Sequence, residues 1–160
     1  MIIKIDDNFL RNKWKYIRQV LIVTVFAAII LVFFDFVVRL AVAASLGATC
    51  FIIFTVPHKN SSQPRYILGG YFIGAVVGSI CSVLSHAAPN IPLGLWGAIA
   101  IGISMFFMVI LNFEHPPASA LSLGIVIGGF NLGMIITVFS IALCLLGVRR
   151  LLRKWLIDLI

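Results

Sequence analysis

The sequence predicts an all-α fold, a polytopic bundle of transmembrane helices built from six hydrophobic segments. Of its 160 residues, 62% are hydrophobic and only 11% are charged, whereas a soluble domain carries about 25% charged residues. No Asp, Glu, Lys or Arg occurs between Tyr66 and Phe113, or between Pro116 and Val148. Because a bilayer core requires about 20 consecutive apolar residues for each spanning helix, such stretches indicate several membrane crossings.

The hydrophobic segments follow the order long, short, long and then again long, short, long. The long segments are 17–38, 66–85, 93–111 and 131–148, and the short ones are 40–56 and 117–130. As a helix, segment 117–130 would reach only about 21 Å, against a bilayer core of about 30 Å. We therefore expect it to be a half-helix buried among the others, or to be completed by irregular backbone.

If all six segments cross the membrane, each half crosses three times, and the two halves are inverted relative to each other. Inverted repeats with a short or broken helix in each half are a recurrent plan of transporters, which hold the substrate near the midplane. The alternative is a four-helix protein with two surface-lying or re-entrant segments. Along the chain we expect a basic segment at 1–16, one transmembrane domain at 17–148 and a second basic segment at 149–160.

The net charge of +7 is concentrated at the two ends of the chain and in one loop. Basic residues precede the first apolar run, occur in loop 57–65, and follow the last run from Arg149 to Lys154. This is the positive-inside pattern, which predicts a lipid bilayer rather than nucleic acid as the partner. Because no transit peptide rich in Ser and Arg is apparent, we expect a multi-pass protein of a bacterial inner membrane with cytoplasmic N- and C-termini.

Small residues recur at every fourth position in three of the segments. These stripes are formed by Gly70, Gly74, Gly78 and Ser82, by Gly94, Ala98 and Gly102, and by Gly124 and Gly128. Small residues allow helix backbones to approach closely in lipid, so the stripes indicate packing within the chain or between the protomers of a homo-oligomer. A narrow pore lined by small residues is the alternative.

Both short segments begin with residues suited to binding a small inorganic anion. The candidates are Ser45, Gly47, Ala48 and Thr49 in the first segment, and His115, Pro116, Pro117, Ala118 and Ser119 in the second. Proline favours the first turn of a helix, where unpaired N–H groups and the positive end of the helix dipole attract anions. We predict that His115, Ser119, Thr49 and the N–H groups near Gly47 and Ala118 converge on one cavity. Alternatively, the hydroxyl groups only bond to their own helices.

Three further residues are candidates for a gate or an access site. Glu114 is a functional candidate if it lies within lipid, although at the cytoplasmic end of a helix it would be solvated. Gln63 and Arg65 end the basic loop, where Arg65 either concentrates anions or anchors the chain to lipid phosphate. No catalytic triad, phosphate-binding glycine loop or cluster of metal ligands appears, so we expect neither enzymatic activity nor a cofactor.

Several of these motifs together resemble those of the HPP family of small integral membrane proteins. The matching residues are Ser45 to Phe51, Gln63-Pro64-Arg65, Gly69-Gly70 and His115-Pro116-Pro117-Ala118. The resemblance covers about residues 18–148. The chain departs from the family pattern at three places: Ala48 stands where Pro is common, Tyr71 where His often follows the two glycines, and Asn112-Phe113-Glu114 where many members have a Thr- and Arg-containing approach to the motif.

The resemblance implies a fold usually described with four transmembrane helices, and it implies nitrite as a substrate, because some members are implicated in nitrite transport in chloroplasts and cyanobacteria. The residues themselves suggest only a small anion. We therefore expect a small-anion transporter or channel that holds the anion at the N-termini of the two short helices. The alternative is a membrane assembly or interaction protein that transports nothing. A polar axis at mid-depth would favour transport, whereas a sealed apolar bundle with His115 in bulk water would favour the alternative.

Overall fold

The computed structural model describes residues 13–15, 17–19, 21–22 and 40–159. Within this part of the chain the regular elements are all helices, as predicted: α2 (Leu40–Thr55), a 3₁₀ turn η1 (Asn60–Ser62), α3 (Pro64–Ala87), α4 (Leu93–Ile110), α5 (Pro116–Gly128) and α6 (Leu132–Leu152). Three of them, α3, α4 and α6, are long and apolar enough to cross a membrane. The first predicted long segment, 17–38, lies mostly outside the described residues, so the inverted relation of the two halves stays a prediction.

The short helix α5 begins and ends where its sequence requires. Pro116 and Pro117 occupy its first turn, where the missing N–H groups of proline cost nothing. It ends before Gly129, whose φ of 78° is a conformation that favours glycine. The side chain of Asn131 then caps α6 by accepting a hydrogen bond of 3.0 Å from the N–H of Met134.

The helix α6 extends beyond the predicted boundary at residue 148 and ends at Leu152. Arg149 and Arg150 lie in its last turn, where the helix dipole stabilises positive charge. The basic C-terminal segment predicted at 149–160 is therefore partly helical, because its first residues continue the preceding span.

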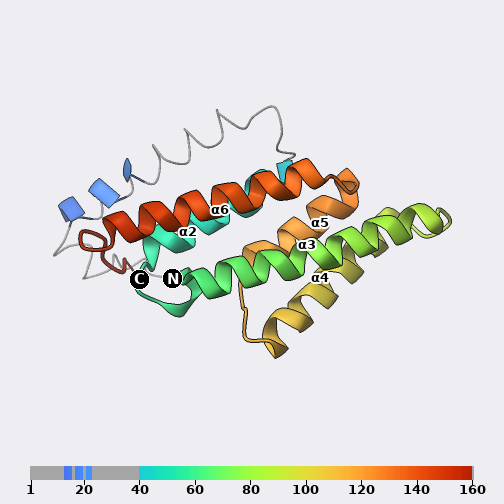
Figure 1. Cartoon of the computed structure of the whole chain (residues 1–160), viewed down its shortest axis with the longest axis horizontal. Coiled ribbons are helices and arrows are strands. Elements are labelled where there is room, and N and C mark those ends of the chain that lie inside the picture. The colour runs from blue at the N-terminus through green and yellow to red at the C-terminus, as the bar shows by residue number, and fades with distance from the viewer. Residues whose placement is uncertain (1–12, 16, 20, 23–39, 160) are drawn as a thin grey trace, which may run out of the picture.

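The helix α5 lies at the centre of the described bundle and contacts α2, α3 and α4. Figure 1 shows it between α2 and α3. Three pairs of neighbours, Gly70 with His115, Gly74 with Ala118 and Gly78 with Ser122, run in the same direction along α3 and α5, so these helices are parallel. Segment 117–130 is thus a half-helix buried among the others, the first of the two predicted alternatives.

The glycine stripe on α3 packs against α5 of the same chain. A Cβ atom added to Gly70 would lie 2.5 Å from Cβ of His115, and one added to Gly78 would lie 2.8 Å from Cα of Ser122. A Cβ on Gly74 would collide with the carbonyl oxygen of Ala118. Only glycine therefore permits this approach of the two backbones.

The stripe on α4 faces away from the neighbouring helices. A Cβ atom added to Gly94 or to Gly102 meets nothing within 4 Å, and Ala98 is exposed. Within the described residues this stripe makes no helix contact of the kind seen on α3, so it is available to lipid or to a second protomer.

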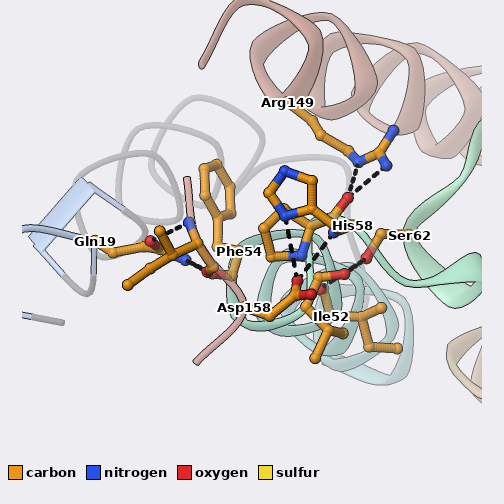
Figure 2. Close-up of polar contacts among 10 residues, drawn as sticks. Gln19, Ile52, Phe54, His58, Ser62, Arg149 and Asp158 are labelled. Atoms are coloured by element: carbon orange, nitrogen blue, oxygen red, sulfur yellow. Dashed lines mark hydrogen bonds and ion pairs between the residues drawn. The ribbon is translucent and has the colours of Figure 1, made fainter. Parts of the chain in front are cut away.

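Hydrogen bonds join loop 57–63 to residues near the C-terminus, among them Arg149 and Asp158 (Figure 2). Nε of Arg149 donates a hydrogen bond of 3.0 Å to the carbonyl oxygen of Pro57. The N–H of His58 donates to the carboxylate of Asp158 at 3.0 Å, and Gln19 bonds to the carbonyl oxygen of Phe54. This arrangement agrees with the predicted topology, in which the basic loop and the C-terminus share one side.

The turn at 112–115 places His115 inside the bundle, whereas Asn112 and Glu114 are exposed. Its Phe113 ring lies beside Arg65, with 5.3 Å between the guanidinium carbon and the ring centroid. The Phe113 ring packs on Gly69, and His115 packs on Gly70. At a rise of about 1.5 Å per residue, Gly70 lies about 9 Å along α3 from Pro64. The half-helix therefore begins inside the bundle, with His115 fully buried just before its first residue.

Candidate functional site

A cluster of buried polar side chains joins α2, α3 and the residue that precedes α5. Its members are Ser45, Thr49, Tyr71 and His115, each 0% exposed. The hydroxyl oxygen of Thr49 lies 2.9 Å from Nε2 of His115 and 2.6 Å from the phenol oxygen of Tyr71. Thr49 is thus the central member of the cluster, because it connects the imidazole to the phenol.

Ser45 and the aromatic rings complete this cluster. The Ser45 hydroxyl donates a hydrogen bond of 2.5 Å to the carbonyl oxygen of Pro117 and lies 3.3 Å from the phenol oxygen of Tyr71. The rings of Tyr71 and His115 meet edge to face, with centroids 5.1 Å apart. The Thr49 hydroxyl also lies 3.1 Å from the carbonyl oxygen of Ser45, so bonding to its own helix is one of its contacts and not its whole role.

The other ring nitrogen of His115, Nδ1, makes no hydrogen bond within the described part of the chain. Nδ1 is also buried. The neighbouring Pro116 and Pro117 cannot donate to it, because proline has no N–H. Leaving a polar atom buried and unpaired costs about 1–3 kcal/mol, so this nitrogen is available to a ligand.

A cleft of about 350 Å³ lies beside His115. Its walls are largely apolar and include Met105, Met108 and Val109 of α4, while His115, Glu114 and Ser119 supply its polar groups. His115 therefore belongs both to the buried cluster and to the cleft. Ser119 also lines this cleft. Thr49 does not line it, but it contacts the imidazole of His115, which does.

The predicted contribution of helix N-termini is wrong. The N–H of Ala118 donates to the carbonyl oxygen of His115 at 2.9 Å, and the two preceding prolines have no N–H. Gly47 lies well inside α2, which begins at Leu40, so its N–H is used by the helix. Gly47 and Ala48 are also exposed, on a different face of α2 from the buried Ser45 and Thr49.

The three residues predicted as a gate or an access site do not form one group. Gln63 bonds to the side chain of Asn60 at 2.8 Å. The guanidinium carbon of Arg65 lies 5.3 Å from the centroid of the Phe113 ring. Glu114 is exposed and lines the cleft beside His115. Only Glu114 is therefore positioned to influence that cleft directly.

Sequence reasoning missed Tyr71 as a member of the cluster and also missed a second hydroxyl contact. Ser104 of α4 and Ser122 of α5 are both 0% exposed, and their hydroxyl oxygens are 3.3 Å apart. The available signal was a set of isolated hydroxyl groups in apolar segments. It is weak, because such groups commonly bond only to their own helix.

Comparisons with known proteins agree with the membrane character of the bundle. A family model described as "HPP, transmembrane region" matches residues 10–156. A transmembrane protein of Dictyostelium discoideum is 38% identical over 85 residues, which are 52% of this chain and 29% of the relative. The chain thus aligns with less than a third of that relative's length. No solved structure matches the chain.

Proposed function

The chain belongs to the HPP transmembrane family, and we propose that it carries a small anion across its membrane, with nitrite as the substrate. One observation carries this proposal: Nδ1 of His115 is buried without a hydrogen-bond partner among the described residues, and His115 lines a cleft of about 350 Å³. A buried ring nitrogen without a partner gains a hydrogen bond when an acceptor enters. Nitrite is small and offers acceptor oxygens.

The hydrogen bonds around His115 are compatible with a tautomer that can bind an anion. The single proton of the Thr49 hydroxyl can go either to the carbonyl oxygen of Ser45, at 3.1 Å, or to Nε2 of His115, at 2.9 Å. If it goes to Nε2, then Nδ1 carries the ring proton and can donate it to the anion. Tyr71 can in turn donate to the oxygen of Thr49, at 2.6 Å. In this arrangement Thr49 and Tyr71 are positioning residues, and His115 is the group that touches the substrate.

In this proposal the anion is bound by one neutral donor, the imidazole of His115, and not by the helix N-termini that the sequence predicted. A neutral donor holds an anion less strongly than a fixed cation would. Transport requires binding that is favourable enough for the ion to enter and weak enough for it to leave. The carboxylate of Glu114 in the same cleft further limits how tightly an anion is held.

The alternative is a membrane assembly protein that transports nothing. That function would be supported by an apolar bundle in which His115 contacts bulk water. Instead His115 is 0% exposed and is bonded within a polar cluster that connects three helices, which supports transport. In the proposed function the protein performs no covalent chemistry and uses no cofactor.

We further propose that the protein resides in a bacterial inner membrane with both termini cytoplasmic. Support comes from the basic side chains at one end of the bundle, where Arg149 bonds to the carbonyl oxygen of Pro57, since positive charge is concentrated on the cytoplasmic side of membrane proteins. We also propose a homo-oligomer in which the exposed stripe on α4, defined by Gly94, Ala98 and Gly102, contacts a second protomer.

Uptake by proteoliposomes tests the transport function. We expect purified protein to accelerate nitrite uptake, and we expect nitrate, formate and chloride to define its selectivity. His115→Ala should reduce nitrite uptake at least tenfold, on the order of one lost hydrogen bond to an ion. His86→Ala is the matched control, because His86 bonds to the carbonyl oxygen of Ser82 and lies outside the cleft. Equal uptake by wild type, by His115→Ala and by empty liposomes would refute the proposal.

A further inference from the structure

A second cleft, of about 660 Å³, lies between the start of α3 and the end of α6. We call it the basic groove. Its charged side is formed by Arg149, Arg150 and Arg153. Its apolar side is formed by Leu68, Leu143 and Leu146. None of the residues that line it also lines the cleft at His115, so the two clefts are separate.

The positive charge in the basic groove lacks a partner among the described residues that line it. No acidic side chain belongs to its lining. The carboxylate of Asp158 accepts from the N–H of His58 at 3.0 Å and lies 3.5 Å from its Nδ1. Arg149 bonds to the neutral carbonyl oxygen of Pro57 (Figure 2), which fixes the guanidinium without neutralising it.

The spacing of these arginines makes the groove favourable for an anion. Arg149 and Arg153 are four residues apart, a spacing at which like charges on a helix destabilise one another. An anion bound between the arginines would remove this repulsion. Guanidinium groups also match phosphate oxygens, with which they form paired, charge-assisted hydrogen bonds.

The apolar side indicates that this anion is attached to a hydrocarbon chain. Leu143 is 56% exposed and lies on α6, which is apolar and long enough to cross a membrane. Gly147 lies between Leu143 and the arginines along α6, and a Cβ atom there would meet nothing within 4 Å. The groove therefore runs from a charged end to an apolar surface past Gly147, a position that has no side chain.

The depth of the groove agrees with a lipid headgroup. Trp155 is 65% exposed just beyond the end of α6, and Trp is enriched where the bilayer meets water. The arginines lie between this residue and the apolar part of α6. Lipid phosphates occupy the same level of a bilayer, and basic pockets between transmembrane helices bind anionic headgroups.

We propose that the basic groove binds an anionic phospholipid, with the lipid phosphate on Arg150 and Arg153 and the first part of an acyl chain along Leu68 and Leu143. A free inorganic anion would use the arginines alone and would leave the apolar side of the groove unoccupied. The bound lipid connects α3 to α6 at the end of the bundle where their charges accumulate.

Lipid binding to the purified full-length chain tests this proposal, measured by native mass spectrometry in detergent. We expect dioleoylphosphatidylglycerol to bind and dioleoylphosphatidylcholine to bind at least tenfold more weakly. The double variant Arg150→Gln/Arg153→Gln should bind phosphatidylglycerol about 10- to 30-fold more weakly, on the order of 1 kcal/mol for each basic residue. The matched control, Lys59→Gln/Lys154→Gln, loses the same charge near the same end outside the groove lining and should change binding less than threefold.

A third variant separates the lipid from a free anion. Gly147→Leu should block the groove and expel the lipid without loss of thermal stability, because leucine is the better helix former and its Cβ meets open space. Equal loss of binding in both double variants, equal binding of the two lipids, or unchanged lipid binding by Gly147→Leu would each overturn the proposal. So would displacement of the lipid by millimolar inorganic phosphate. Because His115→Ala should bind the lipid as wild type does, failure of the transport proposal would leave this result unaffected.

Discussion

The hydroxyl oxygen of Thr49 lies 2.9 Å from Nε2 of His115, although the two residues are 66 positions apart in the chain. Thr49 lies on the short helix α2, and His115 immediately precedes the short helix α5. The contact connects the short helices of the two predicted halves, and both side chains are fully buried. The position of the imidazole therefore depends on a helix from the other half of the chain.

Thr49→Val should weaken both folding and transport. Valine has nearly the shape of threonine but removes the hydrogen bonds to His115 and Tyr71. Hydrogen bonds between membrane helices contribute about 0.6–1.7 kcal/mol each, so we expect a measurable fall in melting temperature in detergent. Nitrite uptake should fall about tenfold, because the imidazole loses the partner that selects its tautomer.

Thr49→Ser is the control for this prediction, because it keeps the hydroxyl and removes only a methyl group. It should retain most of the uptake of the wild type. If Thr49→Val transports nitrite as fast as Thr49→Ser, the hydroxyl has no positioning role.

The sequence predicted this contact only in part. Charge-free segment lengths and the proline and glycine residues at their ends are local signals, and they predicted α2, α5 and the proximity of Thr49 to His115. The prediction of unpaired N–H donors was wrong, because local sequence signals do not show which N–H groups are already hydrogen-bonded in the folded chain. The helix α2 begins at Leu40, which places Gly47 in its interior, and the N–H of Ala118 is used by His115.

Tyr71 and the use of the glycine stripe could not be predicted in the same way. A single tyrosine in an apolar segment shows no periodicity, and its partners Ser45 and Thr49 belong to another helix. A glycine stripe predicts close approach but does not name the partner helix. The parallel register of α3 and α5 brings Gly70 to His115, and that register arises from the packing of the whole bundle.

Glu114→Gln should make anion binding tighter. The carboxylate of Glu114 lines the same cleft as His115, and it is exposed, so water and salt partly screen its repulsion of an anion. We expect the KM for nitrite to fall roughly twofold to fivefold at low ionic strength, and the effect to shrink in 0.5 M salt. A rise in KM would indicate that Glu114 serves a cation or a proton that accompanies the anion.

His115→Gln should restore part of the activity that His115→Ala loses. The glutamine side chain keeps an oxygen that can accept from the Thr49 hydroxyl and an NH₂ group that can donate to a ligand. It lacks the ring that packs edge to face on Tyr71. We expect nitrite uptake between those of the wild type and His115→Ala. Uptake by His115→Gln no higher than that of His115→Ala would mean that the ring itself, and not the hydrogen bond, is required.

Gly74→Leu should prevent normal folding, whereas Gly102→Leu should not. A Cβ at Gly74 collides with the backbone oxygen of Ala118, which cannot move without shifting α5, while a Cβ at Gly102 meets open space. We expect Gly74→Leu to lower the yield of folded protein severely in detergent, an effect of several kcal/mol. Gly102→Leu should have the melting temperature of the wild type and should form smaller oligomers, as measured by light scattering. Wild-type stability of Gly74→Leu would contradict the close contact between α3 and α5.

Labelling of single cysteines should place residues 60 and 154 on one face of the membrane and residue 90 on the other. The expectation rests on the hydrogen bond from Arg149 to the carbonyl oxygen of Pro57 and on that from the N–H of His58 to Asp158, which hold the basic loop and the C-terminal residues at one end. Residue 90 follows the far end of α3, a helix that is long enough to span. Asn60, Asn90 and Lys154 are all exposed and so accept a cysteine without disturbing packing.

The background must lack Cys50, Cys81 and Cys144, because Cys144 is exposed and would itself react. In intact cells, an impermeant maleimide should modify only the cysteine at position 90, since the positive-inside pattern predicts that the basic end is cytoplasmic. In inside-out vesicles, the same reagent should modify the cysteines at 60 and 154 instead. Modification of 60 and 154 from opposite faces would be incompatible with the hydrogen bonds that join the loop to the C-terminus. Modification of all three from one face would mean that α3 does not cross the membrane.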